Sequence, residues 1–311
     1  MSIELNSNYK SSLELYQIGK NLDFLVDLYQ SKKLPKILML SGKKGIGKFT
    51  LVYHFMNFLF DNENYDLVNK KINKDSPFNK QYMENTFPNI IYLPGDNFRN
   101  VKIEDIRNLK AQLLKTTILD KERFIILDDI ELFNVNSLNS LLKIIEEPSE
   151  KNFFILINNK TKSLIETIYS RSIEIKINLN NVMRKKTIES LINNNGIDVL
   201  IDYEHTSITP GNFLLFNEIV NLNNININDE LLVNIEKILT LYKKSKNINL
   251  INLSLLLTDY YFQNVNIKKN KNLENNINDR NFIVNNINKF VTYNLNQNSL
   301  INALSEKLSN E

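Results

Sequence analysis

The chain has 311 residues, of which 42% are hydrophobic and 23% charged, a balance typical of a globular protein long enough for two or three domains. It has no cysteine, which excludes disulfides and thiolate metal sites, and two histidines, too few to favour a histidine-built metal centre. The net charge of +3 is too small to indicate nucleic-acid binding by itself.

The amino-terminal residues carry no sign of a targeting segment. The first ten, MSIELNSNYK, contain no apolar run, and no stretch reaches the roughly 18 apolar residues of a membrane-spanning helix. The sequence therefore predicts a cytoplasmic protein.

Short apolar runs alternate with amphipathic stretches in the first 180 residues. Such alternation predicts buried parallel strands joined by helical crossovers, and hence an α/β domain. The predicted buried strands cover 37–40, 90–93, 124–127 and 153–157. Residues 173–177 alternate between apolar and polar types, which predicts a fifth, more exposed strand. The predicted helices cover 13–30, 48–60, 103–116 and 136–146. The stretch 62–85 is polar and rich in Asn and Lys, which predicts poor order.

Beyond residue 180 the strand-like runs end and helical periodicity takes over. The predicted helices cover 182–193, 213–221, 229–243, 247–263 and 281–307. The chain is therefore expected to be an α/β domain followed by helical domains.

A glycine-rich segment lies between the first predicted strand and the helix at 48–60. Its spacing matches the phosphate-binding loop, in which glycines let backbone N–H groups converge on a phosphate and a lysine supplies charge. Its residues are Gly42, Lys43, Lys44, Gly45, Ile46, Gly47 and Lys48. The segment predicts a nucleotide site, and the structural alternative is a tight turn that binds nothing.

The position after the lysine departs from the pattern of active enzymes. A Ser or Thr hydroxyl normally holds Mg²⁺ there, whereas this chain has Phe49. Thr50 offers a hydroxyl one residue later, about 100° further around the helix. The phosphate cradle is present and the metal ligand is missing, so these residues leave ATP binding open.

Two carboxylates follow the predicted strand at 124–127. Asp128 resembles the aspartate that orients Mg²⁺ at the end of such a strand. Asp129 stands where active enzymes of this type carry glutamate, and it is one methylene shorter. The alternative is a pair of solvated carboxylates that cap the segment starting at 130.

Four further segments resemble motifs of one known family. Residues 139–148, NSLLKIIEEP, resemble its "NALLKxLEEP" signature, and 167–172, TIYSRS, resemble its "TIxSRC" motif. Residues 87–90, FPNI, are similar to "HPDL", and 101–109, VKIEDIRNL, are similar to "IxIDQIREL". With the phosphate loop, these matches keep their order across 37–177. They resemble the AAA+ delta-prime subunits of the bacterial DNA polymerase III clamp loader.

The resemblance implies an architecture and a set of partners. It implies an AAA+ RecA-like P-loop domain over 1–178, a small helical lid over 179–226 and an all-α collar over 227–311. The implied partners are the ATPase subunits, the clamp-opening delta-type subunit and, through the complex, the sliding clamp and primed DNA. Many members carry four zinc-binding cysteines where this chain has 61–86. No zinc is expected here, and the fold of that stretch is left open.

The resemblance also assigns roles to single residues. Phe49, Asp129 and the segment 209–212, which replaces a sensor-2 arginine, imply that the subunit does not hydrolyse ATP itself. Asn158 occupies the sensor-1 place. Arg171 matches the arginine that reaches into a neighbouring subunit's ATP site, where a guanidinium stabilises charge on the γ-phosphate. The alternative for Arg171 is an ordinary surface salt bridge.

The predicted function is a clamp-loader subunit of the DNA polymerase III holoenzyme that helps to load the sliding clamp during DNA replication. The alternatives are an active clamp-loader ATPase and an unrelated P-loop NTPase. Three basic residues near one face of the helix at 103–116 are candidates for contacts with DNA phosphates, although a solvated face explains them better: Lys102, Arg107 and Lys110.

Overall fold

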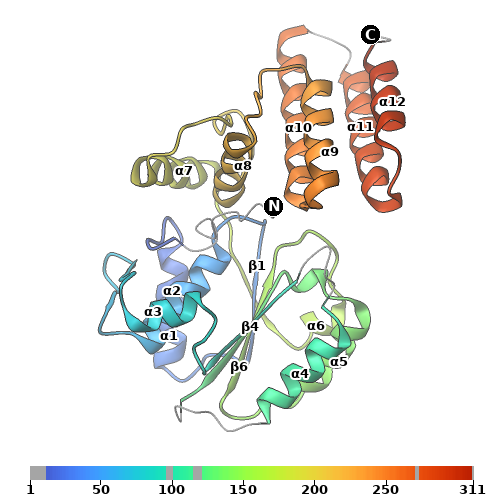
Figure 1. The fold of residues 1–311 in the computed structure, drawn as a ribbon. Coiled ribbons are helices and arrows are strands. Elements are labelled where there is room, and N and C mark those ends of the chain that lie inside the picture. The colour runs from blue at the N-terminus through green and yellow to red at the C-terminus, as the bar shows by residue number, and fades with distance from the viewer. Residues whose placement is uncertain (1–11, 96–100, 115–120, 270–272, 310–311) are drawn as a thin grey trace. The chain divides into compact units, whose positions relative to one another are not determined.

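The computed structural model describes residues 12–95, 101–114, 121–269 and 273–309 (Figure 1). Contacts divide the chain into two compact units. The larger unit contains the residues up to Gly196 and also the segment Ile208–Asn212. The smaller unit contains Ile197–Ser207 and the residues from Phe213 onward.

A five-stranded parallel sheet forms the centre of the larger unit. Its strands lie in the order β4-β5-β6-β1-β7, which confirms all five predicted strands. Their bounds are β1 Ile37–Ser41, β4 Ile90–Pro94, β5 Arg123–Asp128, β6 Asn152–Asn158 and β7 Ile173–Lys176. Because the strands are parallel, the segments that follow them meet at one edge of the sheet.

Helices cover both faces of this sheet (Figure 1). One face carries α1 Gly19–Gln30, α2 Lys48–Phe60 and α3 Pro77–Met83; the other carries α4 Ile103–Leu113, α5 Val135–Ile145 and α6 Glu166–Tyr169. Alternate side chains of β1 enter the two cores, with Leu38 and Leu40 on the first face and Met39 on the second. The predicted α/β architecture is therefore correct.

The first helix begins later than the periodicity predicts. Backbone groups of Leu13 and Leu15 instead bond to Ile72 and Lys70, so this segment runs extended beside a hairpin. Helix α1 starts at Gly19. The predicted helix over 13–30 is thus wrong in its first turn and a half, because tertiary pairing takes those backbone groups.

The stretch 62–85 is ordered, contrary to the prediction from its polarity. It forms a hairpin of β2 Tyr65–Asp66 and β3 Lys71–Ile72, followed by α3, whose first turn is capped by Ser76. Tyr65, Phe78 and Tyr82 are buried in the core beside α2. A few aromatic side chains supply the buried area that the average composition conceals.

The rest of the chain is helical, as predicted. Helices α7 Asn181–Asn195 and α8 Pro210–Leu222 precede a bundle of α9 Leu231–Ser245, α10 Ile248–Lys269, α11 Leu273–Tyr293 and α12 Gln297–Ser309. Helix α9 packs on α10 and α12, and α11 packs on the same two. The single helix predicted over 281–307 is two, because Asn294 adopts a left-handed φ of 50° between them.

The division into a lid over 179–226 and a collar over 227–311 remains a prediction. In the described ranges, every helix is too short or too polar to cross a bilayer.

Candidate nucleotide site

The phosphate loop lies at the carboxyl edge of the sheet. Residues 42–47 connect the end of β1 to the start of α2, and Gly47, at the N-cap of α2, has a φ of 99° that favours glycine. The Gly42 N–H donates to the carbonyl of Asn158 at 3.2 Å, so the loop is tied to the end of β6. The predicted strand, loop and helix are all present.

The loop lysine is bound by the loop itself. Lys48 is 2% exposed, and its Nζ donates to the carbonyls of Gly42 at 2.7 Å and Lys43 at 2.8 Å. Burial lowers the pKa of Lys48 to about 8, although Asp128 and nearby carboxylates oppose that change. The Lys48 ammonium could bind a phosphate only after its hydrogen bonds to these two carbonyls were broken.

Phe49 belongs to a chain of contacts that ends on Asp128. Its ring lies edge-to-face against Tyr92, with 5.4 Å between ring centroids. The Tyr92 hydroxyl donates to Asp128 Oδ2 at 3.1 Å. Burial, and then the negative charge of Asp128, raise the pKa of Tyr92 well above its usual range. In an active enzyme of this type, Mg²⁺ is expected to lie between a hydroxyl at the start of the helix and the aspartate at the strand end. In this chain the aromatic pair of Phe49 and Tyr92 connects those two positions instead.

Asp129 is held by two partners inside the protein. Lys44 Nζ lies 3.1 Å from its Oδ2, and Asn159 Nδ2 donates to its Oδ1 at 2.6 Å. Burial alone would lower the pKa of Lys44, but Asp129 and the neighbouring carboxylates raise it. Asp128 and Asp129 are each 4% exposed, so the alternative of two solvated carboxylates is wrong. The Asp129 side chain also makes no capping bond to the short 3₁₀ helix η2 Ile130–Leu132.

The structure distinguishes the two asparagines at the end of β6. The amide of Asn158, the predicted sensor, donates to the Tyr169 hydroxyl of α6 at 2.9 Å. Asn159, which sequence reasoning missed, reaches Asp129 instead. Glu131 fixes this turn by accepting hydrogen bonds from the backbone N–H groups of Asn159 and Thr161. Nothing in the residue types marks Asn159, because the turn after β6 decides which amide faces the acidic strand end.

The segment 209–212 packs directly on the phosphate loop. Thr209 Oγ1 donates to the carbonyl of Lys44 at 2.7 Å, and the Gly211 N–H donates to the carbonyl of Gly45 at 2.7 Å. A Cβ on Gly45 would lie 2.4 Å from Thr209 Oγ1. Glycine is therefore required at Gly45 for this close approach as well as for its φ of +82°. The segment predicted to replace the sensor-2 arginine thus supports the loop.

Arg171 lies at the amino ends of the strands, opposite the carboxyl ends where the phosphate loop lies. It precedes β7, whose first residue Ile173 pairs with Leu38 near the start of β1, whereas the phosphate loop follows Ser41 at the end of β1. About 10 Å of strand separates those two levels. Arg171 forms an ion pair with Glu146, and its side chain is 36% exposed. The predicted site residues thus fall into two groups, the loop with its acidic strand end and the distant Arg171.

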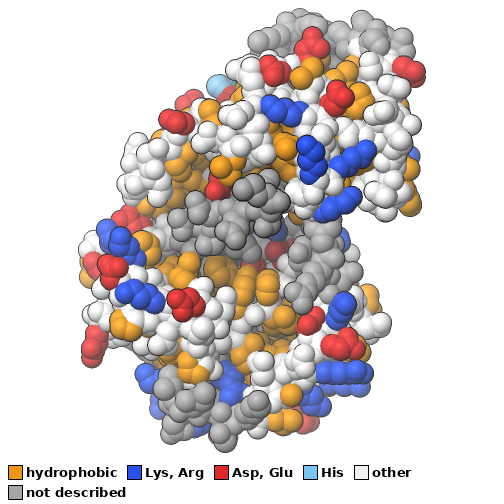
Figure 2. Space-filling view, viewed as in Figure 1, with side chains coloured by type: hydrophobic (Ala, Val, Ile, Leu, Met, Phe, Trp, Pro, Cys, Tyr) orange, Lys and Arg blue, Asp and Glu red, His pale blue; other side chains and the backbone are white. Residues whose placement is uncertain are grey.

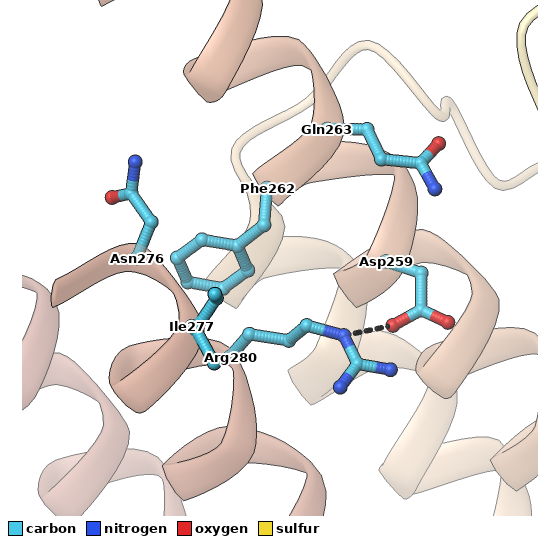
Figure 3. Close-up of a pocket in the computed structure, with 6 residues that line it drawn as sticks. All are labelled: Asp259, Phe262, Gln263, Asn276, Ile277 and Arg280. Atoms are coloured by element: carbon cyan, nitrogen blue, oxygen red, sulfur yellow. Dashed lines mark hydrogen bonds and ion pairs between the residues drawn. The ribbon is translucent and has the colours of Figure 1, made fainter. Parts of the chain in front are cut away.

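We also searched the described residues for metal sites and cavities. These residues contain no cluster of three or more His, Cys, Asp or Glu side chains that could hold a metal ion. A cavity of about 130 Å³ lies beside α10 and α11 (Figure 3) and is closed on one side by the 2.7 Å ion pair of Arg280 with Asp259. It is smaller than the roughly 300–1,000 Å³ typical of small-molecule sites.

The basic residues of α4 and its N-cap lie on a surface that also carries acidic side chains. Lys102 and Lys110 are exposed, and Arg107 lies 3.6 Å from Glu104. Figure 2 shows Lys and Arg side chains alternating with Asp and Glu over α4 and α5. A stripe of one sign, which would favour phosphate contacts, is not present on that face of the described residues.

The comparisons agree with the fold and with the motifs. A family described as "DNA polymerase III, delta subunit" matches residues 19–181, more than half of the 311 residues. The chain belongs to this family. The family match covers the phosphate loop, the acidic strand end and Arg171.

Two individual relatives are named DNA polymerase III subunit delta'. A DNA polymerase III subunit delta' from Buchnera aphidicola is 27% identical over 56% of this chain and 52% of its own length. One from Pseudomonas aeruginosa is 31% identical over 29% of this chain and 27% of its own length. The chain therefore spans about half the length of the first relative and less of the second.

A solved structure was also found in the comparison. A DNA polymerase III gamma subunit-related protein from Thermotoga maritima has a TM-score of 0.44 at 17% identity, over 92% of this chain and 98% of that one. The fold of this family member is an α/β domain with a parallel sheet, followed by a helical part.

Proposed function

We propose that this chain is the delta-prime-type subunit of a DNA polymerase III clamp loader, and that it helps to load the sliding clamp onto primed DNA without hydrolysing ATP itself. Membership of the family supports the first part. The contacts from Phe49 through Tyr92 to Asp128 support the second. The proposed partners are the ATPase subunits and the clamp-opening delta-type subunit, with the clamp and primed DNA reached through the complex.

The argument against hydrolysis begins with the metal. Mg²⁺ demands oxygen ligands in near-octahedral geometry, and the ring of Phe49 offers none. Asp128 accepts a hydrogen bond from Tyr92, so a metal would have to displace that bond as well. Asp129, in the place of the water-positioning glutamate, is neutralised by Lys44. Three elements of a hydrolytic site are thus replaced or occupied.

The same geometry bears on the cofactor. The backbone N–H cradle of the loop persists, which suits a phosphate. Lys48, however, is bound to two carbonyls of the loop, and breaking those bonds would oppose nucleotide binding. We therefore propose weak affinity for Mg–ATP and no turnover.

Arg171 supplies the active part of the proposed function. Its position at the sheet edge opposite the chain's own loop excludes action on that loop, whereas its exposed guanidinium suits a site on a neighbouring subunit. An arginine that meets the γ-phosphate in trans stabilises transition-state charge, and is worth about 10³–10⁵-fold in well-studied enzymes.

The test is ATP turnover stimulated by primed DNA in the reconstituted clamp loader, with wild-type chain and with Arg171→Ala. We expect a fall in turnover with the assembly intact, and no turnover by the isolated chain. Turnover by the isolated chain that is lost in Lys48→Ala would instead show an active ATPase.

A further inference from the structure

The ion pair of Arg171 has a specific form. Arg171 Nε and Nη2 both donate to one oxygen, Glu146 Oε1, at 3.1 and 2.7 Å. Nη1 donates to the carbonyl of Thr167 at 3.2 Å and to the Ser170 hydroxyl at 3.4 Å, both within the arginine's own turn. A guanidinium has five N–H groups in a rigid planar fork. The four contacts use four of these five N–H groups, so one N–H of Nη2 remains at the Nη1–Nη2 edge for an outside anion.

Glu146 is itself held in a fixed place. It is the C-cap residue of α5, and its backbone N–H donates to Leu142 in the last turn of that helix. The preceding residue, Ile145, is 3% exposed in the same core cluster as Ile168 of α6, which is 0% exposed. The backbone that carries the Glu146 carboxylate and the turn that carries Arg171 are thus fixed to one packed core.

The turn around Arg171 is also constrained. The Ser172 hydroxyl donates to the carbonyl of Ile168 at 2.9 Å, and the hydroxyl of Tyr169 accepts the Asn158 amide. The backbone of the turn is therefore set, while the long side chain of an exposed arginine would be free to rotate without a partner. Glu146 is the charged partner that fixes it in the described structure.

We infer that Glu146 is a positioning residue, which holds Arg171 by one edge so that the other edge faces a polyphosphate on a neighbouring subunit. This inference rests on the proposed action of Arg171 in trans. It adds the first glutamate of the 139–148 motif to the machinery, although that residue touches no phosphate itself. A carboxylate carried by a rigid helix end lowers the cost of ordering the arginine side chain during reaction.

The experiment is a double-mutant cycle in the reconstituted clamp loader, with kcat and KM for ATP measured in the presence of primed DNA. The variants are Glu146→Ala, Arg171→Ala and the double substitution. Glu147→Ala is the matched control, because it removes the same charge from the exposed neighbouring position outside the ion pair. Glu146→Gln keeps an acceptor oxygen without the charge.

We expect Glu146→Ala to lower kcat by about 10-fold with KM little changed, since a misplaced group costs rate rather than ground-state binding. Glu146→Gln should recover part of the rate, and Glu147→Ala should match wild type. In the Arg171→Ala background, Glu146→Ala should have no further effect. An exposed ion pair contributes little to folding, so thermal unfolding of Glu146→Ala should match that of Glu147→Ala.

Three results would overturn the inference. Unchanged kcat in Glu146→Ala, with Arg171→Ala impaired, would refute positioning and leave the proposed function standing. Increased kcat would mean that the ion pair restrains Arg171. A full rate in Arg171→Ala would refute the action in trans, and the positioning role with it.

Discussion

Lys44 Nζ lies 3.1 Å from the buried carboxylate of Asp129, so the phosphate loop places a cation of its own against the acidic strand end. Asn159 completes the contact from the other side. A carboxylate that is 4% exposed needs such partners, because burying an unpaired charge is costly. The pair therefore contributes to stability where an active enzyme would keep its carboxylate free for catalysis.

Replacing Lys44 by Met should destabilise the fold by about 1–2 kcal/mol, less than for a fully buried pair because the lysine side chain is 41% exposed. Urea denaturation at pH 7 measures the change. Lys43→Met is the control, since Lys43 is exposed and lies outside the ion pair. Equal stability of the two variants would show that Asp129 does not depend on Lys44.

Restoring the missing hydroxyl should not restore hydrolysis. In Phe49→Thr, Tyr92 still donates to Asp128 and Lys44 still neutralises Asp129, so turnover should stay at background. The lost contact with Tyr92 should cost about 1 kcal/mol of stability. Phosphate release from Mg–ATP, followed with the isolated chain, is the measurement. Sustained turnover would mean that Phe49 alone had silenced the site.

The loop should tolerate no side chain at Gly45. In Gly45→Ala the new Cβ meets Thr209 Oγ1 at 2.4 Å and the backbone must hold a φ of +82°, so the cost should reach about 3 kcal/mol or more. Gly196→Ala is a matched control, with a φ of +59° and no atom within 4 Å of the added Cβ. That variant should lose only about 1 kcal/mol, the backbone part of the cost. Similar losses in chemical denaturation would argue against close packing of 209–212 on the loop.

Stability should depend on pH through His54, which is fully buried beneath the hairpin. Its Nε2 lies 3.0 Å from the carbonyl of Ser12, which can only accept, so Nε2 carries the hydrogen and Nδ1 accepts from the Tyr65 hydroxyl. Burial lowers the pKa of His54 to about 4. Below pH 6.5 the unfolded chain takes up a proton that the folded chain refuses, so stability falls as pH drops from 6.5 towards 4.

The loss over that window should be on the order of 3 kcal/mol. His54→Gln should be less stable at pH 7 but should show a flatter profile, measured by urea denaturation at pH 7, 6 and 5. His205→Gln is the control, because His205 is exposed and its replacement leaves the buried ring in place. A slope in His54→Gln as steep as that of wild type would assign the pH dependence to other groups.

Strong local patterns account for what could be predicted from the sequence. Apolar runs bounded by polar residues located four of the strands, and the buried ones among them have few other compositions open to them. Alternation of apolar and polar residues located β7, which is partly exposed. The spacing from Gly42 to Lys48 located the loop, because a phosphate cradle needs those residue types in that order. The identities of Phe49 and Asp129 predict that the metal ligand and the glutamate are missing, which remains a prediction.

Contacts between distant segments account for the rest. The average composition of 62–85 is polar, yet the stretch contains three aromatic side chains that are buried in the core. Their contribution to stability depends on α2 packing beside them. Asn158 and Asn159 are chemically identical, and only the turn after β6 decides which of them reaches Asp129. Local pattern thus determined which elements this protein has and which residues are candidates for its site. Tertiary structure decided which partners neutralise the acidic strand end, support the loop and hold Arg171, because hydrogen bonds and ion pairs require distances that residue order does not encode.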